Sequence, residues 1–486
     1  DSAVAYNRDP FAVDVSVGKT DSLYKAHGYH TKVPHLAIVP SILHYTEPGD
    51  VVLDGFGGSG MTGVAAQWCA SAPSAYRHEL ETEWKKQGKA APKWGARRII
   101  LNDLSPAATF MAANYNMPFD IEAFSTAGQK LLKEVASEIG WMYETLHTDG
   151  KTKGQIAYTV WSEVLSCSSC TGVIVFTEAS RNDETQGVED LLTCPHCGSK
   201  AKKEQMDLTF ESFLDPATNS AEKRPKRVPV SIVYKIGKAK FSKKPDDEDR
   251  RTLAKISDLP LPADLPLNRL PDCQMTRVGR MRTTNTSAIH FMFLPRPAQA
   301  MALLWRKAKL HPDPRTRSML LFFVEQALWT ASLLNRYRPT GFSQVNQFLT
   351  GVFYIASQHA EPSPWYILDG KLDRLGKTFR TFQTTPGQAA ISTGSVSSLP
   401  ISNSTVDYIF TDPPFGENIY YADLNILVES WHRVVTDAKP EAIVDRVRQK
   451  GVSEYQHLMQ KCFAEYFRVL KPGRWMTVVF SNSRAA

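Results

Sequence analysis

The stretch VDYIFTDPPFG (406–416) sets an acid and an aromatic ring on a rigid corner of the chain. A short β-rich run ends at Asp412, and Pro413, Pro414 and Phe415 follow. Two adjacent prolines remove two backbone donors and push each preceding residue toward extended geometry, so neither a strand nor a helix continues through them. We therefore expect a strand and then a stiff corner presenting one carboxylate and one ring. Taken alone, this corner is equally consistent with a simple turn.

A glycine-rich stretch, LDGFGGSGMTG (53–63), follows a second expected strand. Its glycines fit the G-x-G-x-x-G pattern, in which the backbone approaches a ligand and the start of a helix favours an anionic group. The next expected strand ends at Asp103, where an acid can bind ribose hydroxyls. Asp54 and Phe56 stand directly before the glycines, which argues against a nicotinamide cofactor. The late position of Asp103 argues the same way unless the polar segment 71–96 is an inserted loop.

Four cysteines form two C-x-x-C knuckles, Cys167 with Cys170 and Cys194 with Cys197. Four thiolates at this spacing suit tetrahedral zinc, and a site with four cysteines has no open position, so we expect a structural metal. A redox role needs only one pair beside a thioredoxin-like unit, which the sequence does not show. We expect His196, inside the second knuckle, to be exposed and not a ligand.

The composition of the 486-residue chain, 42% hydrophobic and 22% charged, is that of an ordinary globular protein. Lysines and arginines exceed acids by 57 − 50 = 7, but the excess is uneven. The segment 223–244 holds nine basic residues and no acid. This basic block suits a polyanion such as DNA, or is a solvated loop.

No apolar run is long enough to span a membrane. The nearest, 319–337, is broken by Glu325 and Gln326 and predicts a buried helix. The first residues lack the basic start and apolar core of a signal peptide, so we expect a cytoplasmic location and no membrane partner.

Strands alternate with helices at both ends of the chain. Residues 50–68 and 97–114 each predict a strand followed by a helix, and 406–411 and 469–482 supply later strands. This alternation predicts an α/β fold with a parallel sheet covered on both faces. The sheet is split by a long middle region that contains the cysteines, the basic block, a proline-rich linker (257–272) and a helical segment.

The glycine-rich stretch and TDPPF together resemble the amino-methylating DNA methyltransferases, whose motifs are D-x-F-x-G-S-G and [DNS]-P-P-[YFW]. The segments HTKVPHLAIVPSIL (30–43), YYADLNILVESWHR (420–433) and VLKPGRWMTVVF (469–480) also resemble parts of that superfamily. The resemblance is closest to bacterial adenine-specific DNA methylases that contain a zinc ribbon. It implies a Rossmann-like sheet that uses S-adenosylmethionine, split by an insert with a zinc ribbon and a helical segment.

The resemblance also implies roles for individual residues. Asp412 and the carbonyl of Pro413 would accept hydrogen bonds from the target amino group, and Phe415 would stack on the flipped base. Asp103 would hold the ribose of the cofactor. The methionine end of the cofactor would be lined by Asp54, Phe56, Gly58 and Gly60.

Two departures from the family pattern stand out. The family often has an acid that helps to bind the cofactor adenine just before the catalytic strand, where this chain offers Ser395. The chain also ends soon after the segment 469–480, so we expect the usual final strands of such a fold to be missing from it.

This interpretation divides the chain into four parts. Residues 1–150 form the first, cofactor-binding half of the methyltransferase domain, and 381–486 form the second half with the catalytic motif. Between them, 151–256 is the zinc-ribbon and basic insert. Residues 257–380 are a linker and helical segment suited to target recognition.

The expected activity is transfer of a methyl group from S-adenosylmethionine to the N6 amine of a flipped adenine in double-stranded DNA, with Zn²⁺ as a structural ion. Asp rather than Ser at the start of the catalytic motif favours adenine N6 over cytosine N4. Three alternatives stay open: cytosine N4 methylation, RNA methylation, and a catalytically silent DNA-binding subunit. The sequence leaves open whether the role is restriction-modification, phage defence or regulation, and whether there are partner subunits.

Overall fold

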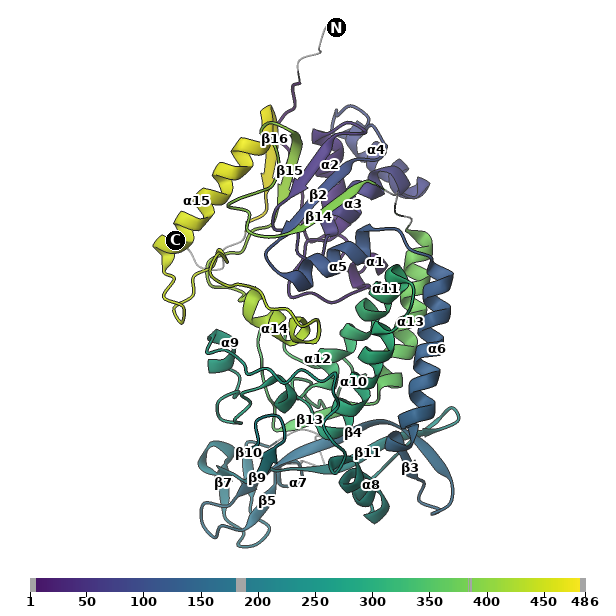
Figure 1. The fold of residues 1–486 in the computed structure, drawn as a ribbon, viewed down its shortest axis with the longest axis vertical. Helices are drawn as coiled ribbons and strands as arrows, with labels where there is room; N and C mark the ends of the chain where they lie inside the picture. Colours follow the sequence, from purple (N-terminus) through teal and green to yellow (C-terminus); the bar gives the residue numbers. More distant parts are fainter. Residues whose placement is uncertain (1–5, 181–188, 383, 385–386, 481–486) are drawn as a thin grey trace. The chain divides into compact units, whose positions relative to one another are not determined.

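The computed structural model describes residues 6–180, 189–382, 384 and 387–480. The chain divides into two compact units (Figure 1). Unit 1 comprises residues 1–124 and 373–486, and unit 2 comprises residues 125–372. The described helices include none that is both long enough and apolar enough to cross a membrane.

Unit 1 is built on a five-stranded parallel sheet with the strand order β14-β2-β1-β15-β16. Its strands, in chain order, are β1 (Val51–Asp54), β2 (Arg98–Asp103), β14 (Ala389–Thr393), β15 (Val406–Thr411) and β16 (Leu470–Val478). The chain runs outward from β1 to β2 and β14 on one side, and from β15 to β16 on the other. The order therefore reverses between β1 and β15. In open α/β sheets, ligands bind at this point, beyond the carboxyl ends of the strands.

Helices cover both faces of this sheet, with α15 on one side and α2, α3 and α5 on the other (Figure 1). The helices of unit 1 are α1 (Ser22–Lys25), α2 (His35–Tyr45), α3 (Met61–Ser71), α4 (Ser74–Lys86), α5 (Pro106–Asn116), α14 (Tyr421–Trp431) and α15 (Val452–Val469). Helix α4 occupies the segment expected to be a loop. That segment appeared polar because α4 buries only Trp84, whose ring meets Phe11 edge-on at 6.1 Å.

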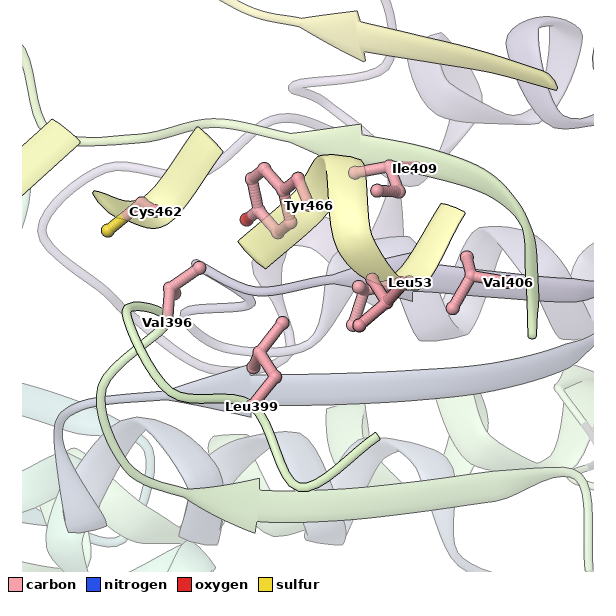
Figure 2. Close-up of a cluster of buried hydrophobic side chains, with 8 residues drawn as sticks. Leu53, Val396, Leu399, Val406, Ile409, Cys462 and Tyr466 are labelled. Atoms are coloured by element: carbon pink, nitrogen blue, oxygen red, sulfur yellow. The ribbon is translucent and has the colours of Figure 1, made fainter. Parts of the chain in front are cut away.

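Alternating strand residues face the two helix layers. Leu53 and Ile409 are paired across β1 and β15 and are fully buried in a cluster with Tyr466 of α15 (Figure 2). Their neighbours point the other way, and the ring of Tyr408 stacks on Tyr45 of α2 at 5.0 Å. Burial on both faces fixes the register of each strand, and thereby the place where each strand ends.

Unit 2 contains an antiparallel sheet with the order β12-β11-β4-β13. These strands are β4 (Lys153–Ser166), β11 (Arg227–Ile236), β12 (Ala239–Lys243) and β13 (Gln358–Pro362). Three short strands also pair with β4, namely β3 (Glu144–Leu146), β5 (Val173–Val175) and β8 (Asp207–Leu208). Two hairpins are formed by β6 (Leu191–Thr193) with β7 (Lys200–Lys202) and by β9 (Phe210–Asp215) with β10 (Ser220–Pro225).

The remaining helices are α6 (Ile121–Ile139), α7 (Phe176–Ala179), α8 (Asp247–Ser257), α9 (Gln274–Arg277), α10 (Pro295–Lys309), α11 (Pro314–Val324), α12 (Leu328–Ala331) and α13 (Pro364–Thr381). Four 3-10 turns are η1 (Gly140–Tyr143), η2 (Lys203–Gln205), η3 (Ile289–Met292) and η4 (Glu325–Ala327). The helix expected over 319–337 is thus interrupted by η4 at the buried Glu325 and ends at Ala331.

Candidate active site

A cavity in unit 1 opens at the carboxyl ends of β1, β2 and β15. It brings together the three expected strand-end acids, Asp54, Asp103 and Asp412. The predicted site residues that line it are Asp54, Phe56, Gly58, Asp103, Ser395, Asp412 and Pro414. Three others are not part of its lining: Gly60, Pro413 and Phe415.

The glycine-rich loop is bound tightly to the end of β2. The Gly57 N–H donates to the carbonyl of Asn102 at 2.9 Å, and the Gly58 N–H donates to Asp103 Oδ2 at 2.8 Å. Gly58 has φ +50°, and a Cβ there would lie 3.3 Å from the ring of Tyr29. The loop thus needs glycine for both its conformation and the space between its backbone and Tyr29.

Gly60 lies where the glycine-rich loop meets α5. Its φ is +88°, and a Cβ would lie 2.8 Å from the backbone of Ala112 and 2.7 Å from the side chain of Asn116, both on α5. The absence of a side chain therefore lets the start of α3 lie against α5. Gly60 shapes the loop from behind and does not face the cavity.

Asp54 is buried at the end of β1. Its Oδ1 accepts the Phe56 N–H at 3.1 Å, and its Oδ2 accepts the Thr62 hydroxyl at 2.5 Å. Burial, together with the nearby charge of Asp412, raises the pKa of Asp54 to about 7 against the opposing effect of the Thr62 hydrogen bond. A cationic ligand group would favour the ionised form of this carboxyl.

Asp103 fixes two loops at once. Its Oδ2 accepts from Gly58 and its Oδ1 accepts the Ser105 N–H at 2.9 Å. Burial raises the pKa of Asp103 to about 6 against these two hydrogen bonds. The carboxylate oxygens retain acceptor capacity beyond their backbone bonds, so the side chain is suited to a ligand hydroxyl.

Asn102, next to Asp103, joins three strand ends, although it belongs to no recognised motif. Its side-chain amide donates to the carbonyls of Gly55 at 3.2 Å and Gly394 at 2.9 Å, and its Oδ1 accepts the Ser392 hydroxyl at 2.9 Å. These bonds link the ends of β1, β2 and β14. A polar residue just before a strand-end acid was its one sequence signal.

Ser395 lines the cavity beyond β14, but its hydroxyl is engaged within its own turn. Its Oγ lies 2.9 Å from Ser397 Oγ and accepts the Ser397 N–H at 3.3 Å. Ser395 therefore offers a ligand less than the acid that the resemblance would place there.

The Asp412 corner is held from behind while its carboxylate stays available. The Tyr455 hydroxyl donates to the Pro414 carbonyl at 2.9 Å, and the Val444 N–H donates to the Gly416 carbonyl at 2.9 Å. No donor to the Asp412 carboxylate is found in the part of the chain that the structure describes. Burial raises the pKa of Asp412 to about 7.

The ring of Phe415 packs edge-on against Phe480, with ring centroids 5.2 Å apart and planes at 74°. Phe415 is half-buried there and does not contribute to the cavity lining. Its expected role against a flipped base stays a prediction.

A buried acid on α14, Glu429, links the two sequence-distant parts of unit 1. The Ser105 and Thr436 hydroxyls each donate to Glu429 Oε1 at 2.6 Å, and the Thr436 N–H donates to Oε2 at 2.8 Å. Asn425 on the same helix donates to Ser105 Oγ at 2.9 Å. Ser105 and Thr436 both line the cavity. No sequence motif predicts this network, because its partners come from distant segments.

Residues 13–69 match a family model described as DNA methylase, of the N6/N4 type. The match supports a methyltransferase. It covers α2, β1 and the glycine-rich loop, and it ends before the catalytic motif. Searches of curated proteins and of solved structures gave no match.

The four knuckle cysteines of unit 2 converge. Their sulfur atoms all lie within 4.8 Å of one another, with Cys167 Sγ 3.8 Å from Cys197 Sγ and Cys170 Sγ 3.7 Å from Cys194 Sγ. Four sulfurs bound tetrahedrally to one Zn²⁺ at ~2.3 Å lie about 3.8 Å apart. The arrangement therefore fits a structural zinc ion.

The two knuckles share one backbone pattern. In each, a cysteine sulfur accepts the N–H of the residue two positions on: Ser169 to Cys167 and His196 to Cys194, both at 3.4 Å. Each turn closes with a residue of positive φ, Thr171 at 58° and Gly198 at 73°. The exposed His196 donates from Nε2 to the Val173 carbonyl at 3.0 Å, so its ring is turned to the backbone.

Six of the nine residues of the basic block lie on β10, β11 and β12, and two of these serve the fold. Arg227 pairs with the fully buried Glu163 at 3.0 Å, and Lys243 lies 3.0 Å from Asp249. Lys235 and Lys240, in contrast, are exposed and stand directly opposite each other on β11 and β12. Like charges in that position destabilise a strand pair, so an anionic partner would stabilise this part of the sheet.

Proposed function

We propose that the chain is an S-adenosylmethionine-dependent methyltransferase that acts on the exocyclic amine of a flipped base in DNA. The observation that carries the proposal is the Asp412 carboxylate, which is held rigidly and has no donor among the described residues. It lies in the cavity that the glycine-rich loop and Asp103 also line. The family-model match over residues 13–69 supports the same conclusion from the other end of the cavity.

The cavity suits the cofactor's chemistry. The Ser59 hydroxyl at the start of α3 is buried, lines the cavity and has no hydrogen-bond partner among the described residues. It and the N-terminus of α3 suit the methionine carboxylate. Asp54 suits the ammonium group and Asp103 the ribose hydroxyls. When bound, S-adenosylmethionine supplies a methyl group on a positively charged sulfur.

Asp412 would make the target amine reactive. An exocyclic amine is a poor nucleophile because its lone pair is delocalised into the ring. Acceptors at Asp412 and the Pro413 carbonyl, aimed at its two hydrogens, favour a pyramidal nitrogen with its lone pair directed at the methyl carbon. Methyl transfer would form the N–C bond as the S–C bond breaks, and the methylated amine would then release one proton to the solvent. The rigid corner contributes positioning and electrostatics, without a covalent enzyme intermediate.

Adenine N6 in double-stranded DNA is the proposed target, because the motif begins with Asp rather than Ser. In unit 2, the cysteine cluster and the exposed lysines of the basic block are proposed to hold structural zinc and to contact phosphates. The four-part division and the Rossmann-like fold belong to the same proposal, which the parallel order β14-β2-β1-β15-β16 supports. Partner subunits of a restriction or defence system would fit this function.

The direct test is radiolabelled methyl transfer to DNA and to RNA, followed by nucleoside analysis of the product. N6-methyladenine in DNA supports the proposal, and N4-methylcytosine or methylated RNA redirects it to those alternatives. S-adenosylmethionine binding without transfer to either polymer would instead indicate a silent DNA-binding subunit.

A further inference from the structure

Glu441 is a buried acid that the proposed mechanism does not use. It lies between α14 and α15, is 5% exposed and lines the cavity that contains Asp412. Its Oε1 accepts the Ala422 N–H in the first turn of α14 at 2.9 Å. Its Oε2 is buried and has no hydrogen-bond partner among the described residues. Burying such an atom is unfavourable unless a ligand supplies the missing hydrogen bond.

The backbone around Glu441 is fixed next to the catalytic corner. Lys450 Nζ donates to the carbonyls of Glu441 at 2.7 Å and Ala438 at 2.9 Å. The Val444 N–H, three residues on, donates to the Gly416 carbonyl at 2.9 Å. Glu441 is thus tied to the segment that follows Asp412, and not to the glycine-rich loop.

This part of the chain contributes several residues to the cavity lining. They include Asp412, Pro414, Tyr421, Ala422, Pro440, Glu441 and Ala442. The residues proposed to hold the cofactor lie elsewhere, at or just after the carboxyl ends of β1, β2 and β14. The Oε2 of Glu441 therefore stands in the same cavity as Asp412, on segments that the cofactor is not proposed to use.

We infer that Glu441 is a further base-binding residue, whose carboxyl donates a hydrogen bond through Oε2 to the ring nitrogen beside the target amine of the flipped base. The inference rests on the proposed function and deepens it. Adenine and cytosine both carry an unprotonated ring nitrogen next to the exocyclic amine, and that nitrogen is an acceptor. Asp412 accepts from the amine while Glu441 donates to its neighbour, so the pair reads the donor–acceptor edge of an amino base.

The donation requires a protonated carboxyl, and the surroundings favour one. Burial, together with the charge of Asp423, raises the pKa of Glu441 to about 7. The Ala422 N–H and the cations Lys450 and Arg448 act in the opposite direction. Arg448 is itself paired with Asp423 at 2.6 Å and with Asp445 at 2.5 Å, so its charge is largely compensated.

The test measures kcat and KM of the full chain from pH 5.5 to 9, with S-adenosylmethionine and unmethylated mixed-sequence DNA. Wild type should show a bell-shaped profile, which rises as Asp412 ionises and falls as Glu441 ionises. Glu441→Ala should lower kcat/KM for DNA about tenfold to a hundredfold, as for a lost buried hydrogen bond. Glu441→Gln keeps a donor, so it should recover part of that loss and lack the falling limb.

Glu454→Gln is the matched control. Glu454 accepts the Gly451 N–H at the start of α15 at 2.8 Å, as Glu441 does at α14, but it does not line the cavity. An equal loss in Glu454→Gln and Glu441→Gln would assign the effect to helix capping and overturn the inference. So would a wild-type profile in Glu441→Ala.

Calorimetric titration with S-adenosylmethionine distinguishes a contact of Glu441 with the base from a contact with the cofactor. Unchanged cofactor affinity in Glu441→Ala supports a base contact, whereas weaker cofactor binding with an unchanged KM for DNA would assign Glu441 to the cofactor ammonium and overturn the inference. Loss confined to the variants leaves the proposed function intact. Absence of transfer by wild type overturns the proposed function, and this inference with it.

Discussion

The Ser105 hydroxyl donates to the Glu429 carboxylate at 2.6 Å, although the two residues are 324 positions apart in the sequence. Ser105 also caps α5 by accepting the Ala108 N–H at 3.3 Å, and Glu429 lies near the end of α14. The bond therefore joins the segment of unit 1 that precedes unit 2 in sequence to the segment that follows it. Both ends of this link reach the cavity through Ser105 and Thr436.

Replacing Glu429 with Gln should destabilise unit 1 and weaken cofactor binding. Glu429 Oε1 accepts two hydroxyls and Oε2 accepts one N–H, so an amide NH₂ on either side loses at least one acceptor position. Unsatisfying a buried group of this kind lowers the free energy of unfolding by about 1–3 kcal/mol. Urea unfolding and calorimetric titration with S-adenosylmethionine check both effects. The exposed Glu79→Gln on α4 is the control, and equal stability of the two variants would contradict the prediction.

Replacing Asp412 with Ala should abolish methyl transfer and leave cofactor binding nearly intact. The carboxylate is expected to touch the amine, whereas the cofactor is expected to rest on the glycine-rich loop and Asp103. Loss of one acceptor in the transition state lowers the rate on the order of 100- to 1,000-fold. If the corner is only a turn, the variant should keep full activity, or lose activity only to the extent that its melting temperature falls. Melting temperature and methyl transfer should therefore be measured on the same preparation.

The strand-end acids could be found in the sequence because each follows a local strand pattern. Each strand was visible as an apolar run, and parallel strands bring their carboxyl ends to one edge. The resemblance implied cofactor contacts for Asp54 and Asp103 and a target contact for Asp412, and the structure brings all three to one cavity. The strands β1, β2, β15 and β16 are confirmed within a few residues of their expected bounds.

Other parts of the site depend on tertiary contacts that no local pattern encodes. Asn102 and Glu429 act through partners from distant segments, and neither stands in a recognisable motif. Gly60 fits the glycine fingerprint, but its use is to admit α5. Arg227 belongs to a basic run in the sequence, yet it neutralises Glu163 inside unit 2.

Removing one zinc ligand should empty the metal site and destabilise unit 2. Cys194 is buried in the cluster, and a serine in its place supplies a poorer ligand, so Cys194→Ser should reduce zinc from one ion per chain toward none. The melting temperature should fall because assembly of the site supplies folding energy. Metal analysis and thermal unfolding are the measurements. Cys273→Ser, at another buried cysteine of unit 2, should retain zinc, and metal-free wild-type protein would disprove the prediction.

Neutralising the exposed lysines of the basic block should flatten the salt dependence of DNA binding. The variant replaces Lys223, Lys235, Lys238 and Lys240 with Gln. Each lysine that contacts a phosphate contributes about 0.9 to the slope of log K against log salt concentration. The slope is measured by fluorescence anisotropy between low and physiological salt.

Two comparisons separate this surface from the rest of the protein. Neutralising four exposed lysines elsewhere, Lys85, Lys86, Lys130 and Lys133, should leave the slope nearly unchanged. Arg227→Met should lower stability, because it leaves Glu163 with one fewer cation. An unchanged slope in the variant of the basic block would show it to be a solvated surface.

The stability of the cofactor-free protein and its cofactor affinity should change in opposite directions with pH. Burial raises the pKa of Asp103 to about 6 and the pKa of Asp54 to about 7. A carboxyl whose folded pKa lies above its unfolded value stabilises the fold at low pH, and this contribution is lost as the pH rises through the folded pKa. The melting temperature of the cofactor-free protein should therefore fall between pH 5 and pH 8.

Binding should strengthen over the same range, because ionised Asp54 and Asp103 attract the cofactor ammonium and accept its ribose hydroxyls. Thermal unfolding with and without S-adenosylmethionine should thus show a stabilisation by the cofactor that grows between pH 5 and pH 8. Asp54→Asn carries no titrating group at the end of β1, so both trends should be weaker in that variant. Cofactor stabilisation that is constant with pH, in wild type and variant alike, would show that these two acids do not hold the cofactor.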